Sequence, residues 1–173
     1  MGFKAIIVDN SKLTCRTLQD IISRDAHFEQ TFTANDPYEA KSVIMENEPD
    51  LVILDIGMPR MDGLQFLKII MERKLIPVVI HSGMAGEGSE NAPAALELGA
   101  VEVIEKIDSK GRAACTLPDF CNRLASAAQA RVKRRTGEIP PKFKPQHDTL
   151  GIFSDVAVLV GPPRADRRLW RVS

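Results

Sequence analysis

Through its first 135 residues the chain alternates short aliphatic runs with longer amphipathic stretches. Five runs have the length of a strand, and they lie at residues 4–8, 28–33, 51–54, 78–81 and 101–104. Four of them are almost wholly apolar, as expected for strands of a parallel sheet that helices cover on both faces. The second run mixes polar and apolar residues, so we expect it at an edge of the sheet. The pattern predicts an α/β fold with a doubly wound, five-stranded parallel sheet.

The stretches between the runs carry signals for the ends of helices. Asp36, Pro37 and Glu39 have the spacing of an N-cap, a proline at the first helical position and a capping-box acid. Three further helices are predicted to start at Asp62, Ser89 and Pro118, and the helix that starts at Ser89 is predicted to end at Gly99. The first 135 residues therefore contain enough paired strands and helices for one domain.

After about residue 136 the character of the sequence changes. Five of the eleven prolines lie from Pro140 to Pro163, and residues 138–148 have no apolar period. We therefore divide the chain into a domain of residues 1–135 and a remainder of residues 136–173, which we interpret as a linker and a short, poorly ordered tail. Residues 151–160 look like one more strand, but a lone strand cannot fold by itself.

Charge and hydropathy exclude several classes of protein. Residues 1–130 hold 13 Lys and Arg against 19 Asp and Glu, a net charge of −6, whereas residues 131–173 hold 10 against 4, a net charge of +6. An acidic body disfavours contact with phosphate backbones, so only the basic tail could serve as a nucleic-acid arm, and we expect no nucleic-acid partner. The longest apolar runs have four or five residues, whereas a membrane helix needs roughly 20. With no signal-peptide pattern at the N-terminus, we expect a cytoplasmic protein without a membrane partner.

Polar residues follow four of the five runs, at the edge where open parallel sheets bind their ligands. They are Asp9 and Asn10 after the first run, Asp55 after the third, Ser82 after the fourth and Lys106 after the fifth. We expect these four strands to be neighbours, so their polar side chains converge. The carboxylates can bind Mg²⁺, and Asp55 at the centre can act as a nucleophile towards phosphorus. Lys106 and Ser82 can neutralise and hydrogen-bond phosphoryl oxygens.

Residues 3 to about 134 resemble the receiver domain of two-component response regulators, and within that family the receiver half of the chemotaxis protein-glutamate methylesterases. The segments that carry the resemblance are IIVDNS at 6–11, LDIGMPRMDGL at 54–64, PVVIHS at 77–82, GEGSE at 86–90 and ALELGA at 95–100, followed by Lys106. The resemblance implies a flavodoxin-like sheet with the strand order 2-1-3-4-5.

The resemblance also implies a phosphorylation switch in chemotaxis-type signalling. Asp55 would take a phosphoryl group from a phosphohistidine of a sensor histidine kinase, and Mg²⁺ would be held by Asp9, Asn10, Asp55 and the backbone carbonyl of Gly57. Ser82 would then be drawn towards the phosphoryl group. The face formed by the last helix and two strands would carry the output to a protein partner. We expect the protein to be a monomer or a weak dimer.

Three residues depart from the family pattern. Asn10 stands where the family usually has a second acid, which predicts weaker binding of Mg²⁺. Val103 replaces the aromatic residue that swings inward on activation, so that readout is not expected here. Ile107 replaces the usual proline after the lysine, so we expect no cis peptide at that position.

The tail does not resemble a complete output domain. In the methylesterase family a linker leads into a catalytic domain whose first strand runs into a turn with the nucleophilic serine. Here residues 156–160 meet Gly161, Pro162 and Pro163 instead. We therefore expect a phosphoacceptor that is not an enzyme, with no methylesterase domain and with a tail that is the remnant of a lost output domain. Our hypothesis is that the gene was truncated or frameshifted near residue 155.

Two other functions fit part of the sequence. A receiver-like interaction module that works without phosphorylation is favoured by Asn10 and Val103. A phosphohydrolase of the haloacid dehalogenase type would also use an aspartate after a first strand with Mg²⁺. That family has a second Asp two residues after the nucleophile, whereas here Ser11 stands two residues after Asp9.

Several polar residues are interpreted as structural. We expect His81 to face the outside or the sheet rather than to transfer protons. The three cysteines form no CxxC pair, and we interpret Cys115 and Cys121 as packing residues. The basic run at 131–135 complements the dipole at the end of the last helix.

Overall fold

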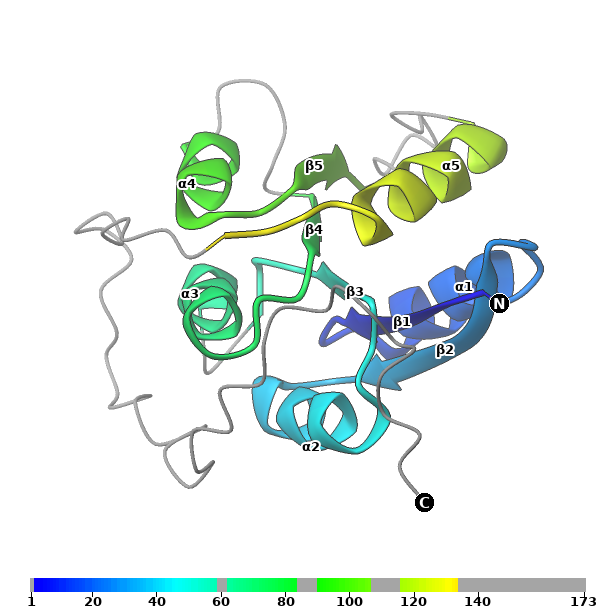
Figure 1. The fold of residues 1–173 in the computed structure, drawn as a ribbon, viewed down its shortest axis with the longest axis horizontal. Coiled ribbons are helices and arrows are strands. Elements are labelled where there is room, and N and C mark those ends of the chain that lie inside the picture. Colours follow the sequence, from blue (N-terminus) through cyan, green and yellow to red (C-terminus); the bar gives the residue numbers. More distant parts are fainter. Residues whose placement is uncertain (1, 59–61, 84–89, 107–115, 134–173) are drawn as a thin grey trace, which may run out of the picture.

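We describe the protein from a computed structural model (Figure 1), which covers residues 2–58, 62–83, 90–106 and 116–133. Five strands form one sheet with every pair parallel, in the order β2-β1-β3-β4-β5. The strands are β1 (Phe3–Val8), β2 (Phe28–Ala34), β3 (Leu51–Leu54), β4 (Val78–Ser82) and β5 (Glu102–Glu105). The predicted fold class and strand order are confirmed, with shifts of one residue at some strand ends.

Five helices connect and cover the strands. They are α1 (Lys12–Ile22), α2 (Pro37–Asn47), α3 (Gly63–Arg73), α4 (Asn91–Leu98) and α5 (Leu117–Ala128). The predicted N-cap of α2 is confirmed, because the Asp36 carboxylate accepts from the backbone N–H groups of Tyr38 and Glu39. The Asp62 carboxylate caps α3 in the same way, and Gly99 ends α4 at φ 109°, a conformation that glycine adopts without strain.

The strict alternation of side chains along each strand builds two hydrophobic layers. On β1, Ile6 and Val8 pack into the layer under α2, α3 and α4, whereas Ala5 and Ile7 pack into the layer under α1 and α5. Figure 1 shows α1 and α5 on one side of the sheet and the other three helices on the opposite side. Because both faces are covered, the central strands are buried along their whole length, as their apolar sequences predict.

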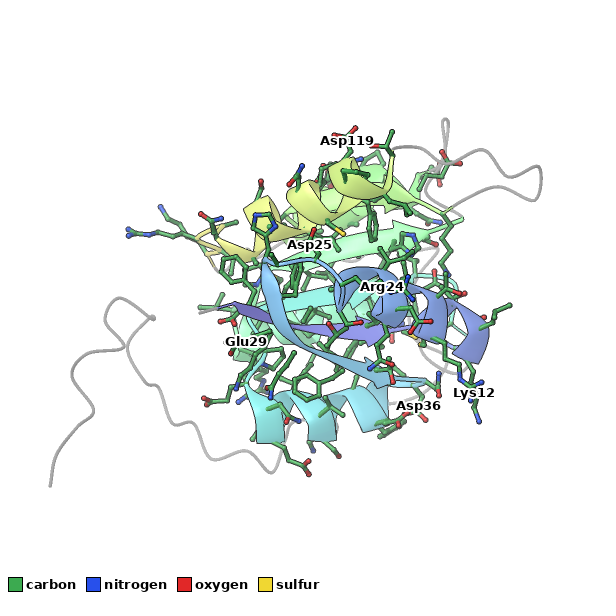
Figure 2. The ribbon with its side chains drawn as sticks, turned by 90° about the vertical axis from the view of Figure 1, so that its right-hand side faces the viewer. Lys12, Arg24, Asp25, Glu29, Asp36 and Asp119 are labelled. Carbon is green, nitrogen blue, oxygen red and sulfur yellow. The ribbon has the colours of Figure 1, made fainter. Side chains whose placement is uncertain are left out.

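The second run mixes polar and apolar residues because, as predicted, its strand lies at an edge of the sheet. β2 pairs only with β1 and therefore lies at one edge of the sheet, where Glu29 and Gln30 are exposed and the next three residues are half-buried. Figure 2 shows Lys12 and Asp36, at the starts of α1 and α2, near the ends of the strand arrows, and Glu29 at the opposite end of the sheet. We call the edge at the strand ends the carboxyl edge.

Some predictions lie outside the described residues. These are the helix start at Ser89, the peptide at Ile107, the packing of Cys115 and the linker and tail at 136–173. The last helix begins at Leu117 after the N-cap Thr116, one residue before the predicted start at Pro118. In the described part of the chain no helix is long and apolar enough to span a membrane.

Candidate functional site

Asp9 lies at the end of β1, where several backbone groups hold it in place. Its N–H donates to the carbonyl of Ala34 on β2 at 3.1 Å, which extends the sheet pairing by one residue. Its Oδ1 accepts from the N–H of Ser11 at 2.8 Å, while Ser11 itself caps α1. The residue is only 1% exposed. The Asp9 carboxylate is therefore buried and oriented before any ligand binds.

Asp55 takes the corresponding position after β3. Its N–H donates to the carbonyl of Val8 at 2.9 Å, and its Oδ1 accepts from the N–H of Gly57 at 3.0 Å. The start of α3 comes close to this turn, since a Cβ on Gly63 would lie 2.5 Å from the Asp55 carbonyl oxygen and 2.6 Å from Cα of Ile56. Only a glycine fits at that approach. Asp55 as a whole is 6% exposed, and its carboxylate lies at the carboxyl edge of the sheet.

Lys106 joins these two carboxylates. Its Nζ lies 2.5 Å from Oδ2 of Asp9 and 2.9 Å from Oδ2 of Asp55, and its own N–H donates to the carbonyl of Ser82 at 3.4 Å. Burial alone lowers the pKa of Lys106, but its hydrogen bonds to the two carboxylates outweigh burial and raise the pKa. The ammonium is therefore charged at neutral pH and sits between two carboxylates.

The same contacts determine the charge of Asp55. Burial is the largest single influence on Asp55 and raises its pKa, but the hydrogen bonds from Lys106, Gly57 and the hydroxyl of Ser82, with the positive charge of Lys106, together outweigh burial. The pKa of Asp55 is consequently lowered. An ionised carboxylate is the form that can attack phosphorus.

The structure brings four of the six predicted site residues into one hydrogen-bonded cluster: Asp9, Asp55, Ser82 and Lys106. Ser82 is fully buried at the end of β4. Asn10 and Gly57 lie exposed at the same edge, next to Asp9 and two residues after Asp55. Within the described residues Asn10 makes no hydrogen bond, which leaves its amide oxygen available to a ligand.

The chemistry of this cluster fits a hard divalent cation. Two carboxylates and one ammonium leave a net charge of −1 at the site, and each carboxylate oxygen has lone pairs left for a further partner. Among the described residues no group of three or more His, Cys, Asp and Glu side chains is placed to hold a metal ion. Mg²⁺ does not need such a group, because it takes one or two carboxylates and keeps several waters.

Two residues that sequence reasoning missed support Asp9. The Asn35 side-chain amide donates to the main-chain oxygen of Asp9 at 3.1 Å, and the thiol of Cys15 donates to the same oxygen at 3.3 Å. Burial and the charge of Asp9 raise the pKa of Cys15 to about 11, so the thiol keeps its proton. Asn35 directly follows β2, so the rule that selected residues after the other four strands would have found it.

His81 lies inside the protein and outside the cluster. It is 8% exposed, and its ring meets Phe120 of α5 edge-on, with centroids 5.6 Å apart. Burial, together with the positive charge of Lys106, lowers its pKa to about 4. The imidazole is therefore neutral, and it is buried against Phe120 of α5 instead of facing the outside. Cys121, on the same helix, is also buried.

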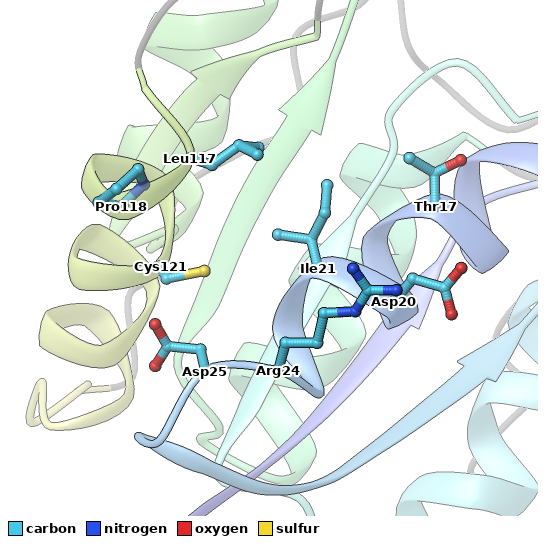
Figure 3. A pocket seen from close by; sticks show the side chains of 8 residues that line it. All are labelled: Thr17, Asp20, Ile21, Arg24, Asp25, Leu117, Pro118 and Cys121. Atoms are coloured by element: carbon cyan, nitrogen blue, oxygen red, sulfur yellow. The ribbon is translucent and has the colours of Figure 1, made fainter.

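A separate pocket lies between α1 and α5 (Figure 3). Its volume is about 500 Å³, and its lining comprises Thr17, Asp20, Ile21, Arg24, Asp25, Leu117, Pro118 and Cys121. None of the predicted site residues lines it. The sequence contained no signal for this pocket, because its walls come from α1 with the turn after it and from α5, which are about 100 residues apart in the chain.

Together, the sheet order and the cluster of two acids, a hydroxyl and a lysine at its carboxyl edge define a receiver-type α/β domain. The family model described as "Response regulator receiver domain" matches residues 5–112, and the chain belongs to that family. The resemblance deduced from the sequence motifs is confirmed.

Curated relatives place the chain in one branch of this family. It is 43% identical over 182 residues to protein-glutamate methylesterase/protein-glutamine glutaminase 3 of Geobacter metallireducens, a match that covers 98% of this chain and 51% of that protein. It is 40% identical over 145 residues to the corresponding protein 2 of Oleidesulfovibrio alaskensis, covering 81% and 41%. The chain thus spans about half the length of the curated relatives it matches.

A solved structure gives the same result for the fold. The response regulator domain of Thermotoga maritima CheB superposes with a TM-score of 0.65 at 26% identity, over 75% of this chain and 98% of that one. The chain is therefore similar in sequence to about half of these methylesterases and in fold to the response regulator domain of that CheB.

Proposed function

We propose that this chain is a phosphorelay receiver in which Asp55 accepts a phosphoryl group from a phosphohistidine of a sensor histidine kinase. The observation that carries the proposal is the ammonium of Lys106, which bridges the buried carboxylates of Asp9 and Asp55. A lysine that only stabilises the fold would be neutralised by one carboxylate, whereas Lys106 pairs with two at the carboxyl edge of the sheet. A site for a transferred phosphoryl group needs a reactive carboxylate with positive charge beside it.

The transfer itself forms one bond and breaks one. A carboxylate oxygen of Asp55 attacks the phosphorus, the P–N bond to the kinase histidine breaks, and the histidine nitrogen keeps the electron pair. The negative oxygens of the phosphoryl group then lie beside Lys106, which can turn its ammonium from the carboxylates to them. The hydroxyl of Ser82, which already forms a hydrogen bond with the carboxylate of Asp55, can donate a hydrogen bond to one of these oxygens.

We further propose that Mg²⁺ is bound beside Asp55. The residues that would hold it are Asp9, Asn10, Asp55 and the backbone carbonyl of Gly57. When bound, the ion supplies positive charge that neutralises the phosphoryl oxygens. Asp9 is suited to this role because its backbone is fixed by Ala34 and Asn35 independently of the ion.

We also propose a place in chemotaxis-type signalling, which the resemblance to the receiver half of the chemotaxis methylesterases implies, with a protein partner that binds the face of α5 and the adjacent strands. On this proposal the domain itself is a phosphoacceptor, and phosphorylation at Asp55 changes how tightly that partner binds.

The proposal is tested with the full chain, Mg²⁺ and acetyl phosphate, followed by the intact mass of the protein. We expect a gain of one phosphoryl group that hydroxylamine removes, as it removes acyl phosphates. Asp55→Asn should abolish the gain, whereas the matched control Asp50→Asn should retain it, because Asp50 lies at the opposite end of β3, where its carboxylate accepts from the N–H of Lys4. Absence of labelling in the unmodified chain would support the phosphorylation-independent interaction module instead.

A further inference from the structure

The imidazole of His81 is the least explained polar group in the described part of the chain. It is more than nine-tenths buried, and its Nδ1 has no hydrogen-bond partner among the described residues. A buried nitrogen without a partner destabilises the fold, and an aliphatic residue would fill the same place without that cost. Stability therefore gives no reason for a histidine at this position.

The place of His81 in β4 suggests another reason. Adjacent residues of a strand point to opposite faces, so His81 and Ser82 look into different parts of the protein. Ser82 bonds to the carboxylate of Asp55, while the ring of His81 rests on Phe120 near the start of α5. Two consecutive residues thus connect the phosphorylation site to a helix on the other side of the sheet.

The neighbouring strand β5 has no aromatic side chain that could transmit the movement of Ser82 instead of His81. Val103 on β5 pairs with Ile80, and its side chain packs into the layer under α2, α3 and α4. It is short and cannot sweep through a large arc as an aromatic ring can. The contact of His81 with Phe120 lies instead in the layer that contains α5, and Phe120 is itself 6% exposed.

We propose that His81 is the positioning residue through which Ser82 acts on α5. When Ser82 moves towards a phosphoryl group on Asp55, the backbone of β4 carries the imidazole against Phe120, and α5 shifts with that ring. No hydrogen bond at Nδ1 to a described residue holds the imidazole in its present position, so the ring can shift without breaking one there. The proposal rests on the proposed function of Asp55.

The test uses the full chain with Mg²⁺ and beryllofluoride, a phosphoryl mimic, and follows backbone amide signals by NMR. The amide of Gly57 reports binding at Asp55, and the amides of Cys121 and Leu124 report the response of α5. In His81→Val and in Phe120→Leu we expect the α5 response to fall by at least about twofold while the Gly57 response is kept. Phe28→Leu is the matched control, because Phe28 is equally buried in the same layer.

The outcomes separate the two proposals. If the Gly57 amide of the unmodified chain does not respond, Asp55 does not take the mimic and both proposals fail. If Gly57 responds and α5 responds equally in the unmodified chain and in both variants, only the role of His81 is overturned. A loss of response in Phe28→Leu as large as in Phe120→Leu would also overturn it, because general loosening of the layer would then be the cause.

Discussion

The Nζ of Lys106 lies 2.9 Å from Oδ2 of Asp55, although 51 residues separate them in the chain. The same nitrogen reaches Asp9, 97 residues away, so one ammonium pairs with two carboxylates that are almost completely buried. The charges of this cluster depend on one another. Changing any one of them should alter both the stability of the fold and the affinity for a cation.

Lys106→Met should destabilise the protein strongly. Removing one partner of a buried ion pair typically costs about 3–5 kcal/mol, because the remaining charge is left uncompensated. Here two carboxylates would remain, so the pKa of Asp55 should rise. We expect a lower free energy of unfolding in urea, and Mg²⁺ should stabilise the variant more than the unmodified chain. Lys68→Met is the control, since Lys68 pairs with Glu72 on the surface and should change stability by about 0.5 kcal/mol or less. Equal losses in the two variants would contradict the buried bridge.

Asn10→Asp should tighten the binding of Mg²⁺. The exposed amide lies next to Asp9, and an added unit charge near a divalent ion at such a position should raise affinity roughly tenfold. Titration calorimetry with Mg²⁺ measures the change. Asn122→Asp adds the same charge at an exposed position on α5 and should leave the affinity as it is. An unchanged affinity in Asn10→Asp would exclude residue 10 from the cation site.

Gly63→Ala should disturb the turn at Asp55. The new Cβ would lie within 2.6 Å of two backbone atoms, which cannot move aside as a side chain can. We expect a loss of about 1–3 kcal/mol in unfolding experiments and slower phosphoryl uptake, because one of those atoms is the carbonyl oxygen of Asp55. Gly83→Ala meets nothing within 4 Å and should be close to neutral. A stable, fully active Gly63→Ala variant would show that the approach of α3 is not needed.

His81 should make the fold sensitive to mild acid. Its pKa is about 4 in the folded protein and 6.5 when unperturbed, so between these values the unfolded chain binds a proton that the folded chain does not. Protonation of His81 therefore costs the fold nothing above pH 6.5, and the free energy of unfolding falls as the pH drops towards 4, by up to about 3 kcal/mol.

The measurement is the free energy of unfolding of the unmodified chain and of His81→Val from pH 7.5 to 4. The difference between the two curves removes the contribution of the carboxylates, which titrate in both proteins. It should move in favour of the variant as the pH falls, because valine has no group that takes up a proton. Parallel curves would mean that the imidazole is solvated rather than buried.

The sequence alone was sufficient for the fold and for the location of the site. Apolar runs buried on both faces, the mixed run of β2 and the cap at Asp36 are local signals, and each determined an element whose type and place the structure confirms. The site followed from topology, because parallel strands bring their carboxyl ends to one edge. Asp9, Asp55, Ser82 and Lys106 therefore had to be near one another.

What only the tertiary structure decided are the interactions that depend on distances of a few ångströms between residues far apart in the chain. Three examples are the hydrogen bonds from Asn35 and Cys15 to the backbone of Asp9, the bridging position of Lys106, and the contact of His81 with Phe120. Periodicity places a residue on a strand and on a face. The energy of a hydrogen bond or a ring contact depends on geometry that arises only when helices pack on the finished sheet.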